Sequence, residues 1–475
     1  MSLIEADSPV DRPSRYNAAR MPARLIEALA TTEPLADLFS DESVLRAMLQ
    51  FEVALAKAQA HVGVIPRSAA RAIAAAQTRA FDVSRLAHDM LRAGTPAIPF
   101  VKALTQFVRR KDATAARFIH WGATSQDLAD TALVLLLKQA LPILAKDLTV
   151  LESSLRALSE KHKNTVMLGR TLLQPAPPIT FGLKAANWLS SVRRSREKLE
   201  STFAEALVLQ FGGASGTLAS LGKNGPAVAH ALAKEVGLDC PEAPWHTQRD
   251  RLASLICACG VLTGSLGKMA RDIALMMQNE IAEVAEPAGG GRGGSSTMPH
   301  KRNPIACALT LAAANRMPNL VASFLSTMSP EHERGVGGWQ AEWPTVAAVI
   351  QSTGVAAASM AETASGLWVD PERMRENLEA TNGLIFAERA MMLLAPKIGR
   401  DAAHKILESA ASKSVQEGKR IASVLAEMPD ATKHLNAATL SRIESPEEYL
   451  GSAENFRKAQ LVKKPVTKTM RKKER

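Results

Sequence analysis

The chain has 475 residues, enough to bury a large core and to form two or three domains. Only 4% of the residues are aromatic while 46% are hydrophobic, a balance that favours close-packed, alanine-rich helices over sheets. The formal net charge is +11, and the four cysteines form no CxxC pair, which excludes a disulfide scaffold and indicates reduced thiols in a soluble cytoplasmic protein.

The N-terminal stretch MSLIEADSPVDRPSRY has no apolar segment of the kind that a secretory signal needs. The first strong helical pattern follows at 40–66, where apolar residues recur at three- and four-residue steps. Ser40 or Asp41 can cap its start, and Gly63 followed by Pro66 can end it.

Similar periodicity predicts further long helices at 131–160, 180–210, 250–285 and 305–325, and strand-like alternation is nearly absent. The most apolar stretch, TALVLLLKQALPILA, contains Lys138 and Pro142, which we expect to keep it below membrane length. These patterns predict an all-α protein built on a central bundle of long helices.

A few polar stretches rich in Gly or Pro interrupt the helices and are where function is expected. They lie at 120–127, 169–178, 210–226, 245–251, 290–304 and 332–344. A change in the sequence pattern near 368–378 suggests a separate C-terminal part. We therefore expect four segments: an N-terminal helical domain at 1–125 that begins with a flexible stretch, a central bundle at 126–367, a C-terminal helical domain at 368–460 and a disordered basic tail at 461–475.

The stretch GGRGGSSTMPHKRNP at 290–304 combines glycines, two serines, a lysine and an Asn-Pro pair. Its glycines allow a loop that closes over a ligand. Asn303 before Pro304 is typical of an N-cap followed by a first helical residue. The positive end of that helix, together with Lys301, would make a nearby serine hydroxyl easier to ionise. A plain Gly-Ser connector would not need the residues that follow the serines.

The segment GSSTMPHKRNP resembles the signature of the fumarase/aspartase superfamily, and the likeness extends through most of the chain. HWGATSQD resembles the first signature region of that superfamily and GRTLLQPAPP the second. The resemblance implies three helical domains around a long-helix bundle and a homotetramer, in which three subunits contribute to each active site. It implies a small polycarboxylate substrate, with no metal or organic cofactor, no nucleic-acid partner and no membrane.

The resemblance also assigns roles to residues of these regions. Ser295 matches the catalytic base, which removes a proton alpha to a carboxylate, and His120 is a second candidate catalytic residue. Lys301 and Asn303 match positions that hold the reacting carboxylate. Expected substrate-binding residues also include Thr124, Ser125, Thr171, Gln174, Gln248, Ser296, Met298 and Arg334. For Arg334, Arg249 and Arg251, we expect pairing with an extra carboxylate.

Two positions depart from the superfamily pattern. Leu172 stands where amine- and hydroxide-expelling members carry a histidine in GRTH, and Ala308 stands where related adenylosuccinate lyases have a glutamate. A strongly basic leaving group needs an acid, whereas a carboxylate, with a pKa of about 4, reacts without one. The segments at 331–343, 244–251 and 209–222 resemble the bacterial 3-carboxy-cis,cis-muconate cycloisomerases, a branch that implies lactone formation in protocatechuate breakdown.

Other interpretations stay open at this point. The chain can be an adenylosuccinate lyase or another C–N or C–O lyase of the same superfamily. It can also be a non-catalytic relative, or bind nucleic acid through its basic tail. His120 can serve as a helix cap, and Trp339 and Trp343 can be packing residues. Cys257 and Cys259 lack further ligands at a spacing suited to a metal.

Overall fold

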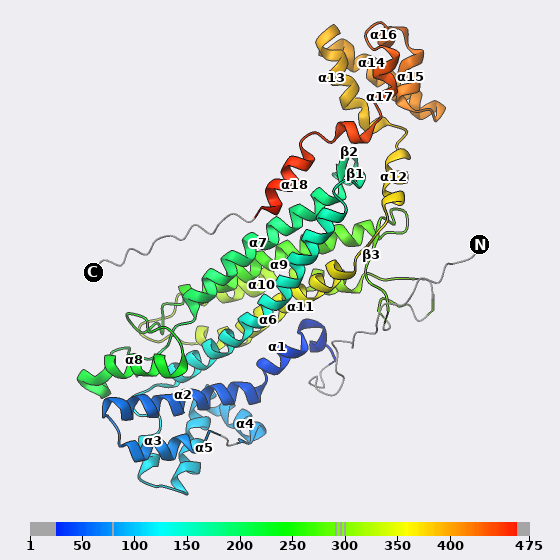
Figure 1. The fold of residues 1–475 in the computed structure, drawn as a ribbon. Helices are drawn as coiled ribbons and strands as arrows, with labels where there is room; N and C mark the ends of the chain where they lie inside the picture. Colours follow the sequence, from blue (N-terminus) through cyan, green and yellow to red (C-terminus); the bar gives the residue numbers. More distant parts are fainter. Residues whose placement is uncertain (1–24, 78–79, 290–291, 295–296, 299–300, 463–475) are drawn as a thin grey trace. The chain divides into compact units, whose positions relative to one another are not determined.

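The computed structural model describes residues 25–77, 80–289, 292–294, 297–298 and 301–462. In this part of the chain helices dominate, and the strands form only two short antiparallel pairs (Figure 1). The predicted all-α class is therefore confirmed. Ser295, Ser296 and the basic tail lie outside the described residues.

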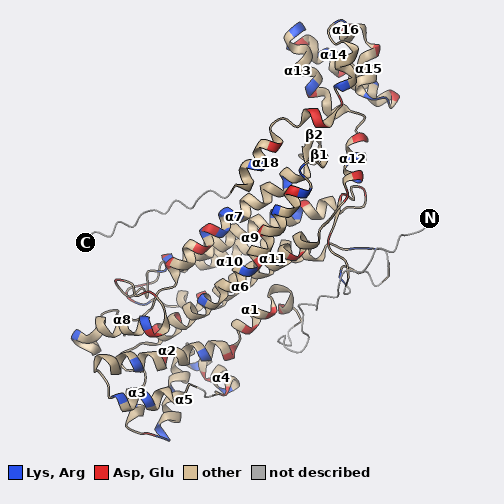
Figure 2. Cartoon of the chain, in the orientation of Figure 1, with Lys and Arg blue, Asp and Glu red and all other residues tan. Residues whose placement is uncertain are grey.

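The long helices of the bundle are α6 (Ser125–Lys161), α7 (Phe181–Ala206), α9 (Asp250–Met276), α10 (Ile305–Leu325) and α11 (Gly338–Gly366). Long stretches of α9, α10 and α11 carry no charged side chain (Figure 2). Small residues let two of them approach closely: a Cβ added at Gly267 of α9 would lie only 2.7 Å from the Cβ of Ala314 of α10. Alanine and glycine thus provide the packing that the sparse aromatics cannot.

The chain divides into two compact units. Unit 1 comprises Met1–Asp147, Ser195–Gly267 and Ala288–Ser359. Its shorter helices are α1 (Glu33–Leu38), α2 (Asp41–Val62), α3 (Arg67–Ala74), α4 (Val83–Ala93), α5 (Ala97–Arg109) and α8 (Gly225–Val236). The predicted helix at 40–66 is confirmed as α2: the Ser40 side chain accepts a hydrogen bond from the Ser43 amide, and Gly63 ends the helix at φ +86°.

Unit 2 comprises Leu148–Arg194, Lys268–Pro287 and Met360–Arg475. It contains the hairpin of β1 (Val166–Thr171) and β2 (Gln174–Thr180), and the pair of β3 (Val284–Ala285) and β4 (Trp368–Val369). Its other helices are α12 (Pro371–Glu379), α13 (Ala387–Ile398), α14 (Arg400–Glu417), α15 (Ile421–Glu427), α16 (Pro429–Thr432), α17 (Ala437–Arg442) and α18 (Ala453–Leu461). Helices α13 to α17 share their own hydrophobic core, which includes Leu394, Leu407 and Leu425.

Two of the long helices, α6 and α9, are long and apolar enough to cross a membrane by length and composition. The expectation that Lys138 and Pro142 would shorten the apolar stretch was wrong, because α6 continues through both residues. The most apolar windows of α6 and α9 are 67% and 61% buried inside the structure. Core helices of a bundle have this burial as well.

Candidate active site

The loop that precedes α6 is fixed to α2 by a buried carboxylate. Glu52 of α2 is 1% exposed, and it accepts hydrogen bonds from the His120 backbone amide at 3.0 Å and from His120 Nδ1 at 2.5 Å. Gln59, which also lies on α2, donates to the carbonyl oxygen of Trp121 at 2.5 Å. His120 has a left-handed backbone, with φ +57°, which is uncommon for a residue with a side chain. The loop therefore holds a conformation that α2 stabilises.

The same contact shifts the pKa of the imidazole. Burial alone would lower the pKa of His120, but the charge and hydrogen bond of Glu52 outweigh burial, so the pKa is raised above its usual 6.5. The negative charge of Asp127 adds to this effect. Since an ionised carboxylate only accepts hydrogen bonds, Nδ1 is the donor in the pair.

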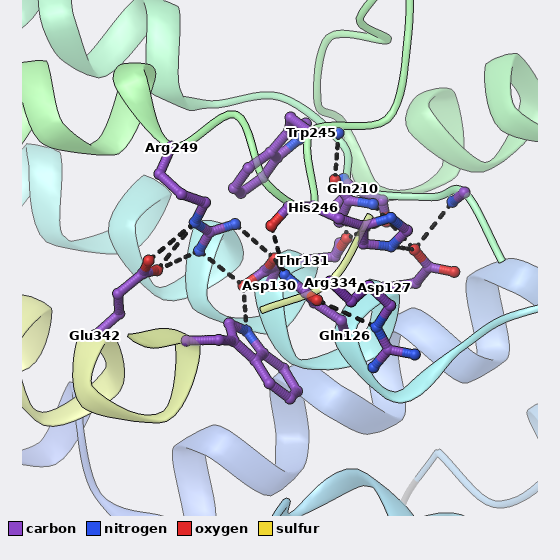
Figure 3. Close-up of polar contacts among 12 residues, drawn as sticks. Gln126, Asp127, Asp130, Thr131, Gln210, Trp245, His246, Arg249, Arg334 and Glu342 are labelled. Carbon is purple, nitrogen blue, oxygen red and sulfur yellow. Dashed lines mark hydrogen bonds and ion pairs between the residues drawn. The ribbon is translucent and has the colours of Figure 1, made fainter. Parts of the chain in front are cut away.

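Arg334 binds the start of α6. Its guanidinium donates to the hydroxyls of Thr124 at 2.6 Å and Ser125 at 3.0 Å. It also donates to the Gln126 side-chain oxygen at 3.3 Å (Figure 3). Three residues predicted to bind substrate, Thr124, Ser125 and Arg334, thus form one cluster in unit 1. In this arrangement a cation lies beside two hydroxyl donors, which suits a carboxylate ligand.

Asp127, in the first turn of α6, joins three polar loops and was not among the predicted site residues. It is fully buried and accepts hydrogen bonds from the backbone amides of Thr124, Gly212 and Gly213 at 2.9–3.0 Å. His246 Nε2 lies 2.8 Å from the same carboxylate, and Gln210 donates to it at 3.0 Å. The loops at 120–127, 210–226 and 245–251 are therefore held together by one side chain.

Arg249 does not face a ligand. It is 3% exposed, and it donates to Asp130 at 2.8 and 3.1 Å and to Glu342 of α11 (Figure 3). Burial would lower its pKa, but the two carboxylates raise it. The expectation that Arg249 neutralises a substrate carboxylate was wrong, because its guanidinium is already occupied by two acids.

A pocket of about 450 Å³ opens beside the His120 loop. Its described lining includes His120, Thr124 and Ser125, together with Lys102 of α5. Lys102 is exposed, and sequence reasoning missed it because a single lysine on a helix normally marks a solvated face. The pocket thus combines a lysine and a histidine with two hydroxyls.

The signature loop is described only in part. The Asn303 amide donates to the Gly293 carbonyl at 2.9 Å, which brings the two ends of the loop together, and Lys301 is exposed. Met298 is 43% exposed. The N-cap of α10 is Pro304 and no side chain caps it, so the expectation that Asn303 caps this helix was wrong.

The second signature region forms the hairpin of unit 2. Thr171 pairs with Gln174 across a two-residue turn, and both are exposed. Leu172 and Leu173 occupy that turn with φ +51° and +65°, and they are 96% and 78% exposed. This is the two-residue hairpin geometry that normally selects Asn or Gly. The described part of the chain therefore leaves both side chains largely uncovered.

Of the remaining predicted residues, one is exposed and two pack together. Gln248 is exposed in unit 1, next to the buried Arg249. Trp339 and Trp343 of α11 pack against each other with ring centroids 4.6 Å apart, and Trp339 Nε1 donates to Asp130 at 3.0 Å. Trp339 therefore has a structural role in the Arg249 network.

Comparison with known proteins assigns the chain to a family. The family model described as lyase matches residues 27–318, and the one described as adenylosuccinate lyase C-terminus matches residues 383–459. A 3-carboxy-cis,cis-muconate cycloisomerase of Bradyrhizobium diazoefficiens is 48% identical over 415 residues, covering 87% of this chain and 92% of the relative.

Other relatives extend this comparison. A nitrosuccinate lyase of Streptomyces davaonensis is 39% identical over 445 residues, covering 92% of this chain and 94% of the relative. The crystal structure of the 3-carboxy-cis,cis-muconate lactonizing enzyme of Pseudomonas putida is 42% identical, with a TM-score of 0.86. That match covers 92% of this chain and 98% of the solved one.

Proposed function

This chain belongs to the lyase family of the fumarase/aspartase superfamily, and we propose that it closes 3-carboxy-cis,cis-muconate to 4-carboxymuconolactone. In this reaction one carboxylate oxygen adds to a conjugated double bond, so a C–O bond forms. The carbanion left next to a second carboxylate then takes up a proton. The substrate is a trianion and the lactone a dianion, so each turnover consumes one proton.

The observation that carries the proposal is the pocket lined by Lys102, His120, Thr124 and Ser125, with Arg334 on its hydroxyls. Lys102 and Arg334 supply positive charge for the carboxylates of the substrate, and His120, whose pKa is raised by Glu52, lies beside them as a polar group. Preorganised donors of this kind stabilise charge where it develops. We infer that Arg334 keeps its contacts to Thr124 and Ser125 until a substrate carboxylate binds to all three.

Leu172 supports the choice of reaction. An aliphatic side chain in the turn cannot protonate a leaving group, and a carboxylate nucleophile needs no acid. Ser295, which the resemblance marks as the proton carrier, would deliver the proton to the carbanion. Lys301 and Asn303 would hold the carboxylate on which the negative charge is delocalised. Gln248, Thr171, Gln174, Ser296 and Met298 would complete the substrate contacts.

The test is an ultraviolet assay of the loss of the conjugated diene from 3-carboxy-cis,cis-muconate, with a pH indicator that counts protons. We expect rapid loss of the diene, one proton taken up per turnover, and a Ser295→Ala variant slowed roughly 100- to 10,000-fold. Nitrosuccinate and adenylosuccinate serve as comparison substrates, because their cleavage takes up no proton. Cleavage of either at a rate equal to lactone formation would overturn the assignment.

We further propose a homotetramer in the cytoplasm, with active sites assembled from different subunits. Mixing Ser295→Ala subunits with Arg334→Gln subunits, each impaired alone, should then give more activity than the sum of the two variants, since some sites combine two intact segments. Sedimentation velocity gives the assembly state of the same samples. If mixed samples show no more than the summed activity of the two variants while they form hybrid tetramers, then Ser295 and Arg334 of a site come from one subunit.

A further inference from the structure

We propose that Glu283 is a positioning residue for the reaction, because through Arg170 it fixes the hairpin of β1 and β2. The tip of this hairpin carries Thr171 and Gln174, which flank the turn. Both are expected to bind substrate, so the inference rests on the proposed function. All four residues belong to unit 2, and Glu283 lies in the segment between α9 and β3.

The two strands of the hairpin hold its base more firmly than its tip. Val166 and Leu168 of β1 are buried in a hydrophobic cluster that α12 shares. Burial then falls along the strand, and Thr171 at its end is exposed. The facing strand, QPAPPIT, contains three prolines, which have no backbone N–H to donate to the ladder. The tip therefore needs a further contact to keep its position.

Arg170 provides this contact, because it is the last residue of β1 before the exposed Thr171. The Glu283 carboxylate is 0% exposed, and it accepts hydrogen bonds from Arg170 Nη1 at 2.9 Å and from Nη2 at 2.7 Å. Such a bidentate pair fixes the direction of the guanidinium as well as its distance. Since Arg170 and Thr171 are consecutive, the pair restricts the movement of the tip.

Glu283 is itself held from three sides. Its backbone amide donates to the carbonyl oxygen of Met276 at 2.9 Å, and its carbonyl oxygen accepts from the Asp370 amide at 3.0 Å. Its side chain also accepts from Asn377 of α12 at 3.0 Å. A carboxylate with these contacts is a fixed support for Arg170, whose own side chain is 25% exposed.

A purely structural ion pair is the alternative, and it predicts a different result. Replacing only Glu283 leaves Arg170 without its counter-ion, which lowers stability under either interpretation. Replacing both residues by glutamine leaves no unpaired charge inside the protein, so much of the stability should return. The two parallel hydrogen bonds that orient Arg170 do not return. Positioning and stability can therefore be separated.

Glu283→Gln should raise the KM for 3-carboxy-cis,cis-muconate about three- to tenfold with a smaller change in kcat, because displaced binding groups weaken substrate binding. In Arg170→Gln/Glu283→Gln, urea titration should show recovered stability while the KM stays raised. In a Thr171→Ala/Gln174→Ala background, Glu283→Gln should change the KM no further. A KM that recovers together with stability, or an effect that persists in this background, would overturn the positioning role.

Hydrogen exchange of the full-length protein adds a measurement that needs no substrate. Peptides covering 166–180 should exchange faster in Glu283→Gln, while those of α13 should not change. Arg457→Met is the matched control: it removes another buried arginine of unit 2, which pairs with Glu160 and Glu454, so it should lower stability without raising the KM. Lack of turnover by the wild type would overturn the proposed function, whereas unchanged exchange of the hairpin in Glu283→Gln would overturn the anchoring.

Discussion

The Glu52 carboxylate holds both the backbone amide and the imidazole of His120, at 3.0 and 2.5 Å, across 68 residues of sequence. One buried acid therefore holds the loop in position and raises the pKa of the His120 ring. The backbone of His120 is left-handed, so this contact also offsets the cost of an uncommon conformation.

Glu52→Gln should shift the pH profile. It keeps the shape of the side chain but removes the charge, so burial will dominate and the pKa of His120 will fall from its raised value toward or below 6.5. If the imidazolium helps to bind substrate, the alkaline limb of kcat/KM should move to lower pH. An unchanged profile in a folded variant would mean that His120 acts uncharged.

The same pair should affect stability in a pH-dependent way. Because the pKa of His120 is raised on folding, its stabilising contribution is complete below 6.5 and is lost as pH rises through the folded value. The difference in unfolding free energy between wild type and Glu52→Gln should therefore be larger at pH 6 than at pH 9. Urea titration at the two pH values measures it.

Lys102→Gln should raise the KM for the trianionic substrate about tenfold, with a smaller effect on kcat, because it removes a cation from the pocket wall. Lys102→Arg should retain most of the affinity. Arg110→Gln, at the exposed end of α5, is the matched control for a lost surface charge. Equal effects in the two glutamine variants would assign the change to long-range attraction.

Arg334→Gln should lower kcat/KM by about 10- to 100-fold, since it removes a charge-assisted contact beside Thr124 and Ser125. Arg334→Lys restores the charge but not the fork that reaches both hydroxyls, so we expect only partial recovery. Glu333→Gln changes an exposed neighbour and should stay near wild type. A fully active Arg334→Gln would remove this residue from the site.

Arg249→Met should lower the free energy of unfolding by about 3–5 kcal/mol, because it leaves Asp130 and Glu342 buried without their cation. The triple change with Asp130→Asn and Glu342→Gln should recover part of that loss. The KM of the folded enzyme should change little. A raised KM without loss of stability would return Arg249 to the substrate site.

The sequence predicts most of the helical frame, because its caps and periodicity are local signals. Ser40 caps the start of α2 and Gly63 ends the helix, as expected. Contacts between residues far apart in the sequence could not be predicted in this way. Nothing near Arg249 in the sequence shows that its guanidinium will bind the carboxylates of Asp130 and Glu342, which are more than ninety residues away.

Part of the site could have been found from the sequence. Glu52 lies between Phe51 and Val53 in an apolar part of a predicted helix, and a charge in that position normally has a partner. Lys102 gives no such signal, because its importance comes from the pocket that α5 and the His120 loop form together. Ser295 and Ser296 lie outside the described residues, so their roles stay predictions.

The turn at Leu172 and Leu173 has a practical consequence for protein engineering. Each left-handed leucine costs roughly 1–2 kcal/mol, which Asn-Gly would largely avoid. That exchange should raise the melting temperature of an isolated subunit. It would also remove two apolar side chains that are exposed at the tip of the hairpin. If the proposed tetramer buries these leucines, the same exchange should weaken the assembly while it stabilises the monomer.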